Sequence, residues 1–441
     1  MDIKNTDIKV YFVGIGGINM SALAAYLLNK GFTIYGSDKN YSMACENLSK
    51  LGAKIFIGHD KSNIEGMDLL VVSSAISEDN EEIRYANENK IPIISRAELL
   101  AFISNKFSTK IGVSGAHGKT TVTSILTHIL YENKLKFTSF IGGFDSKFDN
   151  FCYEGEDILL SEVCEFKRNI NFFNADIAVT LNIDNDHLDS YESFSHLSKT
   201  FFNFLDRGET AVINIDDPIL AKYTKPYISF GFNPLANYTA TKISYKKFLK
   251  FTVLENGKKL FTVNSKLCGK HNIYNILASI AVARTLNIDK TTILNAITNF
   301  SGVSRRFELI GKINNANCFS DYAHHPREIE ALLSSVIPKQ KGELFVVFQP
   351  HTYSRTKLLF EEFIKVFSSL KNLIIFKTYS AREKIDMGYS AYYLSSKLKN
   401  SKYYENFEEI YEYLKENVTA KDLVLFIGAG DIDFFAREYL K

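Results

Sequence analysis

A glycine-rich segment between an apolar run and a helical pattern holds residue types that bind phosphate: Gly115, Ala116, His117, Gly118, Lys119, Thr120 and Thr121. Backbone N–H groups of such a loop, with the N-terminus of the next helix, form an anion site. The lysine would reach terminal phosphates and the threonine would hold Mg²⁺. Val113 occupies the position of the usual first glycine. We therefore expect a nucleoside triphosphate site with a shorter or differently bent loop.

Two later residues have types that suit a metal beside that loop. Glu162 ends an apolar run, Ile158–Glu162, and a carboxylate there would serve Mg²⁺. A glutamate at a strand end is, however, more often a solvated edge residue. His187 ends the stretch 182–187, and imidazole is an unusual Mg²⁺ ligand, so a hydrogen-bonded structural histidine is the ordinary expectation.

An earlier glycine loop approaches a dinucleotide-binding pattern. It contains Gly14, Gly16 and Gly17, and Asp38 ends the following strand, where an acceptor for a ribose hydroxyl would stand. Asn19 replaces the last glycine of the pattern, so helix and strand pack less closely or the loop serves another nucleotide. Two different phosphate loops indicate a reaction between ATP and a nucleotide-carried substrate, since hydride transfer would not need the second loop.

The last third of the chain adds a third group of polar residues near expected strand ends. Arg305-Arg306-Phe307 comes first, and the stretches 321–326 and 349–356 contain three histidines and a further arginine, Arg355. These side chains suit anions and small polar substrates. Arginines at such places are also often ordinary surface residues.

The elements that must position these residues alternate between short apolar runs and helical patterns, which is typical of an α/β fold with parallel sheets. We expect strands at 10–13, 33–38, 69–72, 111–114, 158–162, 177–182, 344–348 and 423–427, with helices at about 20–29 and 119–133. The pattern restarts near 106–110 and again near 302. The sequence thus predicts three domains: a Rossmann-like domain at 1–106, a central P-loop ATPase-type parallel sheet at 107–303 and a second Rossmann-like domain at 304–441.

The composition argues against several further classes of protein. Lys and Arg number 52 against 50 Asp and Glu in 441 residues, so no global field favours nucleic acid or a membrane surface. The five cysteines are scattered and never form a CxxC pair, which fits a reducing compartment. The uncharged stretch from Val10 to Leu28 resembles a signal segment, but its three glycines interrupt the apolar run. We expect a cytoplasmic protein.

The sequence resembles the Mur ligases of peptidoglycan synthesis. The resemblance covers the whole chain in order: Gly14 to Gly17, Ser73 to Ala75, Gly115 to Thr121, Asn182 to Asp189, Gly269 to Asn272 with Asn275, Arg305 to Phe307, Asp321 to Pro326 and Phe348 to His351. The stretches 321–326 and 348–351 are similar to those of the alanine-adding branch of the family.

The resemblance implies an ATP- and Mg²⁺-dependent ligase that joins L-alanine to the lactyl carboxylate of UDP-N-acetylmuramate, acting as a monomer or homodimer. It places these residues at the UDP-sugar: Gly14, Gly16, Gly17, Asp38, His59 and Ser73. It assigns the Mg²⁺ to Thr120, Glu162 and His187. It assigns the ATP to the loop at 115–121 and to five further residues: Asn272, Asn275, Arg306, Asp321 and Tyr322. His325, His351 and Arg355 would meet the alanine, and one of the histidines would take the proton of its amine; Lys119 and Arg306 would act in catalysis.

The sequence departs from the family pattern at Ala116, Asn19 and Ser320 and in the acidic stretch 161–165. Asn19 at a tight turn would weaken diphosphate binding or demand a positive φ, which Asn accepts better than most residues. Three alternatives therefore stay open: a ligase that recycles a murein tripeptide, a UDP-sugar-binding protein without catalysis, and an NAD-dependent oxidoreductase.

Overall fold

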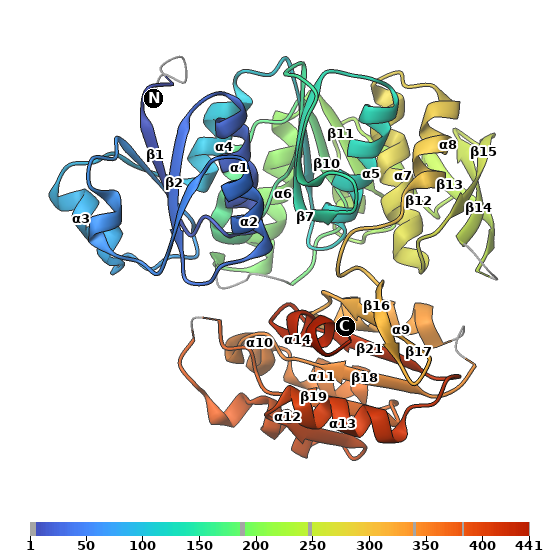
Figure 1. The fold of residues 1–441 in the computed structure, drawn as a ribbon. Coiled ribbons are helices and arrows are strands. Elements are labelled where there is room, and N and C mark those ends of the chain that lie inside the picture. Colours follow the sequence, from blue (N-terminus) through green and yellow to red (C-terminus); the bar gives the residue numbers. More distant parts are fainter. Residues whose placement is uncertain (1–5, 186–189, 246–248, 338–340, 382, 441) are drawn as a thin grey trace. The chain divides into compact units, whose positions relative to one another are not determined.

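The computed structural model describes residues 6–185, 190–245, 249–337, 341–381 and 383–440. The chain is an α/β protein with three sheets (Figure 1). It divides into two compact units, one of Met1–Lys266 with Ile273–Ser301 and one of Leu267–Asn272 with Gly302–Lys441. Within the described ranges, no helix is both long and apolar enough to span a lipid bilayer.

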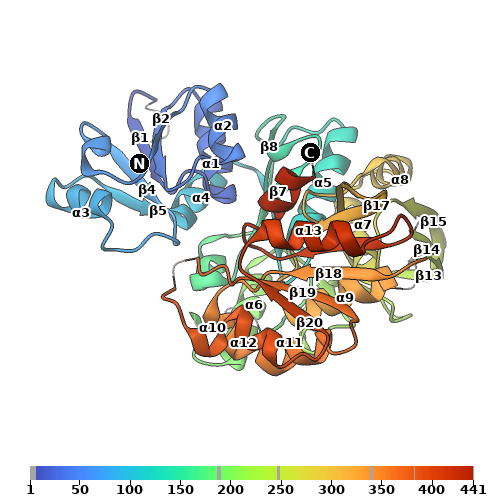
Figure 2. The ribbon, with the colours of Figure 1, turned by 60° about the horizontal axis from the view of Figure 1, so that its bottom comes forward.

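The first sheet has five parallel strands in the order β3-β2-β1-β4-β5. Val10 and Phe12 of β1 belong to the core that contains α1, whereas Tyr11 and Val13 face the core on the side of α3; Figures 1 and 2 both show α1 and α3 on opposite faces. The elements are β1 (Lys9–Val13), α1 (Ile18–Asn29), β2 (Thr33–Asp38), α2 (Met43–Lys50), β3 (Lys54–Ile57), η1 (Lys61–Ile64), β4 (Leu69–Val72), α3 (Glu81–Glu88), β5 (Ile93–Ser95) and α4 (Arg96–Ser104).

The second sheet has ten strands in the order β15-β14-β13-β12-β11-β10-β6-β9-β7-β8. Its middle is parallel, as predicted, but both edges are antiparallel, so the sheet is mixed. Its strands are β6 (Thr109–Ser114), β7 (Phe137–Asp145), β8 (Asp149–Tyr153), β9 (Ile158–Glu162), β10 (Ile177–Thr180), β11 (Thr210–Asn214), β12 (Ile228–Gly231), β13 (Tyr238–Ser244), β14 (Leu249–Glu255) and β15 (Lys258–Ser265). Its helices are α5 (Lys119–Glu132), η2 (Phe166–Phe172), α6 (Phe194–Arg207), η4 (Leu220–Lys222), α7 (Lys270–Thr285) and α8 (Lys290–Asn299).

Helix α1 joins the first two sheets, since it packs against β7 and β8. The Tyr26 hydroxyl donates a hydrogen bond of 2.6 Å to Glu156, which also pairs with Lys30 at 2.7 Å. The Asn150 amide donates to the carbonyl of Ile18 at 2.6 Å. The two sheets therefore share one compact unit.

The third sheet has six strands in the order β16-β17-β21-β18-β19-β20, and only the β16–β17 pair is antiparallel. One core packs α9 and α11 on one face and another packs α13 and α14 on the opposite face (Figure 2). The elements are β16 (Glu308–Ile313), β17 (Ala316–Asp321), α9 (Pro326–Val336), β18 (Leu344–Phe348), α10 (Tyr353–Leu358), α11 (Phe360–Phe367), β19 (Asn372–Phe376), η6 (Met387–Tyr389), α12 (Ala391–Ser396), β20 (Ser401–Tyr404), α13 (Phe407–Asn417), β21 (Leu423–Ile427) and α14 (Ile432–Tyr439).

The apolar runs predicted the buried strands closely. The predicted bounds are those of strands β2, β4, β9, β18 and β21. The five cysteines are free thiols. Other predictions were wrong in extent. The first helix begins at Ile18 rather than near Met20, and β1 and β6 begin at Lys9 and Thr109 rather than at Val10 and Ile111. Strand β10 ends at Thr180 rather than at Asn182.

Candidate active site

The phosphate loop lies between β6 and α5, as predicted. Gly115 and Gly118 have φ of +132° and +91°, values that L side chains adopt only with strain, so both turns require glycine. Gly118 is the N-cap of α5, and Thr120 and Thr121 are buried in the first turn of that helix. The loop therefore directs the N-terminus of α5 toward the carboxyl edge of the sheet.

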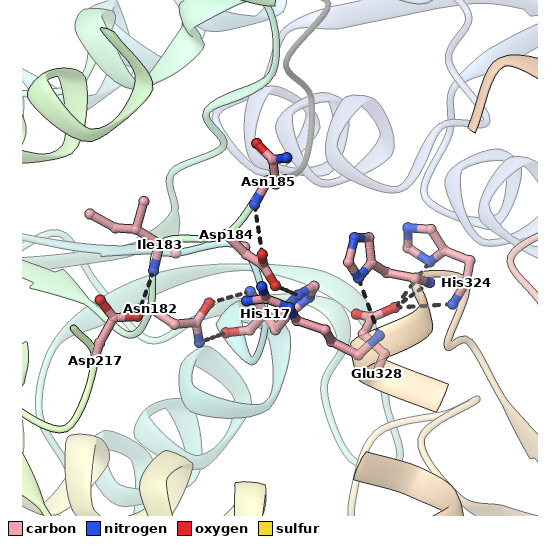
Figure 3. A network of polar contacts seen from close by, with 12 residues as sticks. His117, Asn182, Ile183, Asp184, Asn185, Asp217, His324 and Glu328 are labelled. Atoms are coloured by element: carbon pink, nitrogen blue, oxygen red, sulfur yellow. Dashed lines mark hydrogen bonds and ion pairs between the residues drawn. The ribbon is translucent and has the colours of Figure 1, made fainter. Parts of the chain in front are cut away.

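The end of β10 holds this loop in place (Figure 3). The Asn182 side chain accepts from the His117 N–H at 2.8 Å and donates to the His117 carbonyl at 2.9 Å. The Ala116 N–H donates to the Asn182 carbonyl, and the His117 ring lies 3.3 Å from the buried carboxylate of Asp184. Ala116 takes part in this contact through its backbone N–H, which alanine supplies as well as threonine would.

The ammonium group of Lys119 lies over the loop. It donates to the carbonyls of Gly115 and Ala116 and pairs with Glu165 at 3.3 Å. The Glu165 carboxylate is only 2% exposed, and a buried ion pair of this kind fixes the position of the lysine. Sequence reasoning assigned no role to Glu165; its position three residues after Glu162, within the acidic stretch, was the available signal.

Glu162 ends β9, paired in register with Val113 just before the loop. Its carboxylate accepts from the Gly142 N–H at 2.6 Å, so β7 fixes its position. A carboxylate oxygen and the Thr120 hydroxyl are hard oxygen donors of the type that Mg²⁺ prefers, and the donor set fits that ion. His187, the third predicted ligand, lies outside the described residues.

The first glycine loop begins at the carboxyl end of β1 and leads into α1. The N–H groups of Gly14 and Ile15 donate to the Ser37 carbonyl at 2.8 and 3.0 Å, and the Gly16 N–H donates to Asp38 at 2.9 Å. Gly14 has a φ of +82°. Asn19 lies in the first turn of α1 with helical geometry, so the positive φ considered for it does not occur.

Ser73 and His59 lie at the same edge of the first sheet. The Ser73 N–H donates to the Val13 carbonyl at 3.3 Å, next to Gly14. The His59 Nδ1 lies 2.9 Å from both the Ser37 hydroxyl and the carboxylate of Glu82. Glu82 is completely buried. It was not a predicted site residue, because its sequence neighbours Glu81 and Arg84 make the stretch look like a solvated helix face.

Two predicted nucleotide contacts lie on α7. The Asn272 amide donates to the Cys268 carbonyl at 2.6 Å in the second compact unit. In the first unit, the Asn275 side chain lies against Gly118, where any Cβ would overlap it.

In the second unit, Asp321 organises the loops at the carboxyl edge of the third sheet. Its carboxylate accepts from the N–H groups of Phe307 and Ala323, both at 2.8 Å. Burial raises the pKa of Asp321 to about 6, against the opposing effect of Arg306 and of these two N–H groups. The guanidinium groups of Arg305 and Arg306 lie 4.7 and 5.5 Å from the centroid of the Tyr322 ring.

Arg305 is a third residue that sequence reasoning left without a role of its own. Its guanidinium donates to the carbonyls of Gly428 and Gly430 at 2.6 and 3.0 Å. It thereby ties the loop after β21 to the loop before β16.

His325 is the N-cap of α9. Its Nδ1 accepts from the Arg327 N–H at 3.3 Å, and Glu328 accepts from the N–H groups of His324 and His325, which completes a capping box. Figure 3 shows the bonds between His324 and Glu328. Because Nδ1 is an acceptor, the neutral His325 ring carries its hydrogen on Nε2.

His351 follows β18 and stacks on the Tyr379 ring at 5.5 Å. Its Nδ1 lies 3.0 Å from Nη1 of Arg355, which must donate, so the neutral ring again carries its hydrogen on Nε2. Burial, with His324, Arg355 and Arg305, lowers the pKa of His351 to about 3. Both histidines thus present N–H donors, which suits a carboxylate and disfavours the predicted role as proton acceptor.

Comparison with known proteins gives one consistent family. Three family models match in order: "Mur ligase family, catalytic domain" at residues 9–108, "Mur ligase middle domain" at 113–283 and "Mur ligase, glutamate ligase domain" at 305–430. The UDP-N-acetylmuramate–L-alanine ligase of Clostridium beijerinckii is 39% identical, over 100% of this chain and 99% of its own length. The Clostridium tetani enzyme of the same name is 40% identical over 96% of both chains. The crystal structure of UDP-N-acetylmuramate-alanine ligase from Thermotoga maritima has a TM-score of 0.86 and 28% identity, with 98% of both chains covered.

Proposed function

Because the chain belongs to the Mur ligase family, we propose that it joins L-alanine to the lactyl carboxylate of UDP-N-acetylmuramate, with conversion of ATP to ADP and phosphate, in the synthesis of peptidoglycan precursors. Relatives of that name match the chain over nearly its whole length. The observation that carries the proposal is the phosphate loop, whose Lys119 heads α5 at the same sheet edge as Glu162.

The first sheet binds the sugar nucleotide in this proposal. The glycine loop at 14–17 lets the backbone approach the diphosphate at the N-terminus of α1, and Asp38, His59 and Ser73 at the same edge complete the site. The tight turn at Gly14 and the bond from Gly16 to Asp38 hold the loop in position for this task.

The second sheet binds ATP through residues 115–121, with Lys119 at the γ-phosphate and Asn275 beside the loop. Asn272, Arg306, Asp321 and Tyr322 also serve the nucleotide. Thr120, Glu162 and His187 would hold Mg²⁺, which supplies positive charge that offsets the charge on the transferring phosphoryl group.

The chemistry follows from the weak reactivity of a carboxylate. An oxygen of the lactyl carboxylate attacks the γ-phosphorus in line, ADP leaves, and Lys119 stabilises the transferring group. The neutral amine of alanine then attacks the acyl carbon of the resulting acyl phosphate, the bond from that carbon to the phosphate oxygen breaks, and the proton that the amine loses passes to the departing phosphate. Arg355 and the N–H donors of His325 and His351 hold the carboxylate of alanine.

Isotope transfer tests this sequence of bonds. UDP-N-acetylmuramate labelled with ¹⁸O in the lactyl carboxylate is incubated with MgATP and L-alanine, and mass spectrometry follows both products. We expect a sugar nucleotide heavier by one alanyl residue and one ¹⁸O atom in each released phosphate. Product without labelled phosphate would contradict the acyl-phosphate route, and absence of the alanyl product would contradict the proposed function.

A further inference from the structure

Glu82 is a buried carboxylate to which the proposed reaction assigns no role. It lies in the first turn of α3, is completely buried, and every polar neighbour observed for its carboxylate can donate a hydrogen bond. Its Oε1 accepts from the Tyr11 hydroxyl at 2.7 Å, the Asn63 amide at 3.3 Å and the Asp60 N–H at 3.4 Å. A buried charge is costly, so a carboxylate kept in the interior must be stabilised by such donors.

The second oxygen of Glu82 faces a different pair of groups. Its Oε2 accepts from the Ser37 hydroxyl at 2.7 Å and lies 2.9 Å from Nδ1 of His59. The single hydrogen of the Ser37 hydroxyl is given to Glu82, so Ser37 can only accept from His59, whose Nδ1 also lies 2.9 Å from it. Both neighbours therefore require a hydrogen on Nδ1, which leaves Nε2 as the ring nitrogen that can meet a ligand.

We propose that Glu82 is a positioning residue for the sugar nucleotide, and that it acts by fixing the tautomer and orientation of His59. This inference rests on the proposed function, which places His59 at the UDP-sugar. Glu82 does not touch the nucleotide in this account. Tyr11, Asn63 and the Asp60 N–H share its other oxygen, so two donors still hold the carboxylate when one of the three is removed.

A double-mutant cycle on UDP binding tests the proposal. His59→Ala should raise the Kd for UDP about ten-fold, the effect of losing one strong hydrogen bond. Glu82→Gln should raise the Kd by a similar factor. The glutamine side chain has one acceptor oxygen, whereas hydrogen-bond donors face both carboxylate oxygens of Glu82. If Glu82 acts through His59, the double variant should bind UDP no more weakly than His59→Ala alone. Calorimetry measures the Kd in the full-length protein.

Tyr11→Phe is the matched control, since it removes a buried bond to Glu82 and leaves the His59 side untouched. It should lower the melting temperature but keep the Kd for UDP within about two-fold. Additive losses in the cycle, or a Tyr11→Phe variant that binds UDP as weakly as Glu82→Gln, would overturn the inference. Steady-state kinetics should show Glu82→Gln raising the KM for UDP-N-acetylmuramate with kcat nearly unchanged.

Two further measurements separate the possible failures. Should Glu82→Gln not fold, the same cycle is run with Glu82→Asp, which keeps the charge but shortens the reach to His59. ¹⁵N spectra of the histidine rings should show the His59 hydrogen on Nδ1 in the unmodified protein; a hydrogen on Nε2 alone contradicts the inference. A protein that binds no UDP contradicts the proposed function as well, whereas UDP binding with additive losses contradicts this inference alone.

Discussion

Lys119 carries the charge of the central loop, and its position depends on Glu165 and two loop carbonyls. Replacing Lys119 by alanine removes the cation proposed to offset charge on the γ-phosphate. We expect phosphate release to fall by a factor of about 10² to 10³ or more, while the Kd for UDP stays nearly unchanged. Lys110→Ala is the control, because this lysine pairs with Asp176 at the other end of β6. Loss of UDP binding in a folded Lys119→Ala protein would contradict the proposed division of labour.

His351 gives a prediction for the pH dependence of stability. Its pKa is about 3 in the folded state against an ordinary value of 6.5. Between these two values the unfolded chain binds a proton at this residue and the folded chain does not, so its contribution to stability is present above pH 6.5 and declines as the pH falls toward 3. His351→Asn should therefore flatten the decline in urea midpoint between pH 7 and 4. If the urea midpoint of both proteins declined equally between pH 7 and 4, the assignment of this pH dependence to His351 would be contradicted.

The residues that the sequence left without a role share one property. Glu82, Glu165 and Arg305 act through partners that are distant in the chain, such as Tyr11, Lys119 and the carbonyl of Gly428. The sequence shows residue types and spacing, and these were enough to predict the position of the two glycine loops and of Glu162 at the end of a strand. It does not show which charged residue of an acidic helix is turned inward, because that depends on the three-dimensional fold.

Among the elements, the turn into α5 requires glycine at its N-cap position, Gly118. A Cβ at Gly118 would overlap the Asn275 side chain and lie 3.2 Å from Leu181, and φ is +91°. Gly118→Ala should therefore weaken ATP binding at least ten-fold, because both the strain and the overlap disturb the loop. Gly257→Ala is the control: its φ of +76° brings similar strain, but the space around it is open. Equal ATP affinity in the two variants would show that the overlap is tolerated.

The elements also show where prediction from sequence ends. Strands β18 and β21 are continuous apolar runs buried by helices, so the sequence predicted their bounds. The hairpin of β14 and β15 was not predicted. Lys250, Lys258 and Asn264 are exposed there and interrupt the apolar runs, and such an edge strand resembles a loop in composition.

At the scale of the whole molecule, the first two sheets share one compact unit and the third sheet lies in the other. The three domains at 1–106, 107–303 and 304–441 remain our proposal for the division of function. Two compact units predict two calorimetric transitions. Saturating UDP should raise the midpoint temperature of one transition only, because a hundred-fold excess over Kd stabilises the unit that binds UDP by about 2.7 kcal/mol. An equal shift of both transitions would contradict the assignment of UDP to the first sheet.

The most direct measurement is phosphate release from MgATP in the presence of UDP-N-acetylmuramate, with L-alanine, glycine, L-serine or a murein tripeptide offered as the amine. The account predicts release that requires both the sugar nucleotide and an amine, with L-alanine giving the highest kcat/KM. Release with the tripeptide alone would identify a recycling ligase instead. No release with any amine, in a protein that binds UDP, would contradict the assignment of catalysis to this chain.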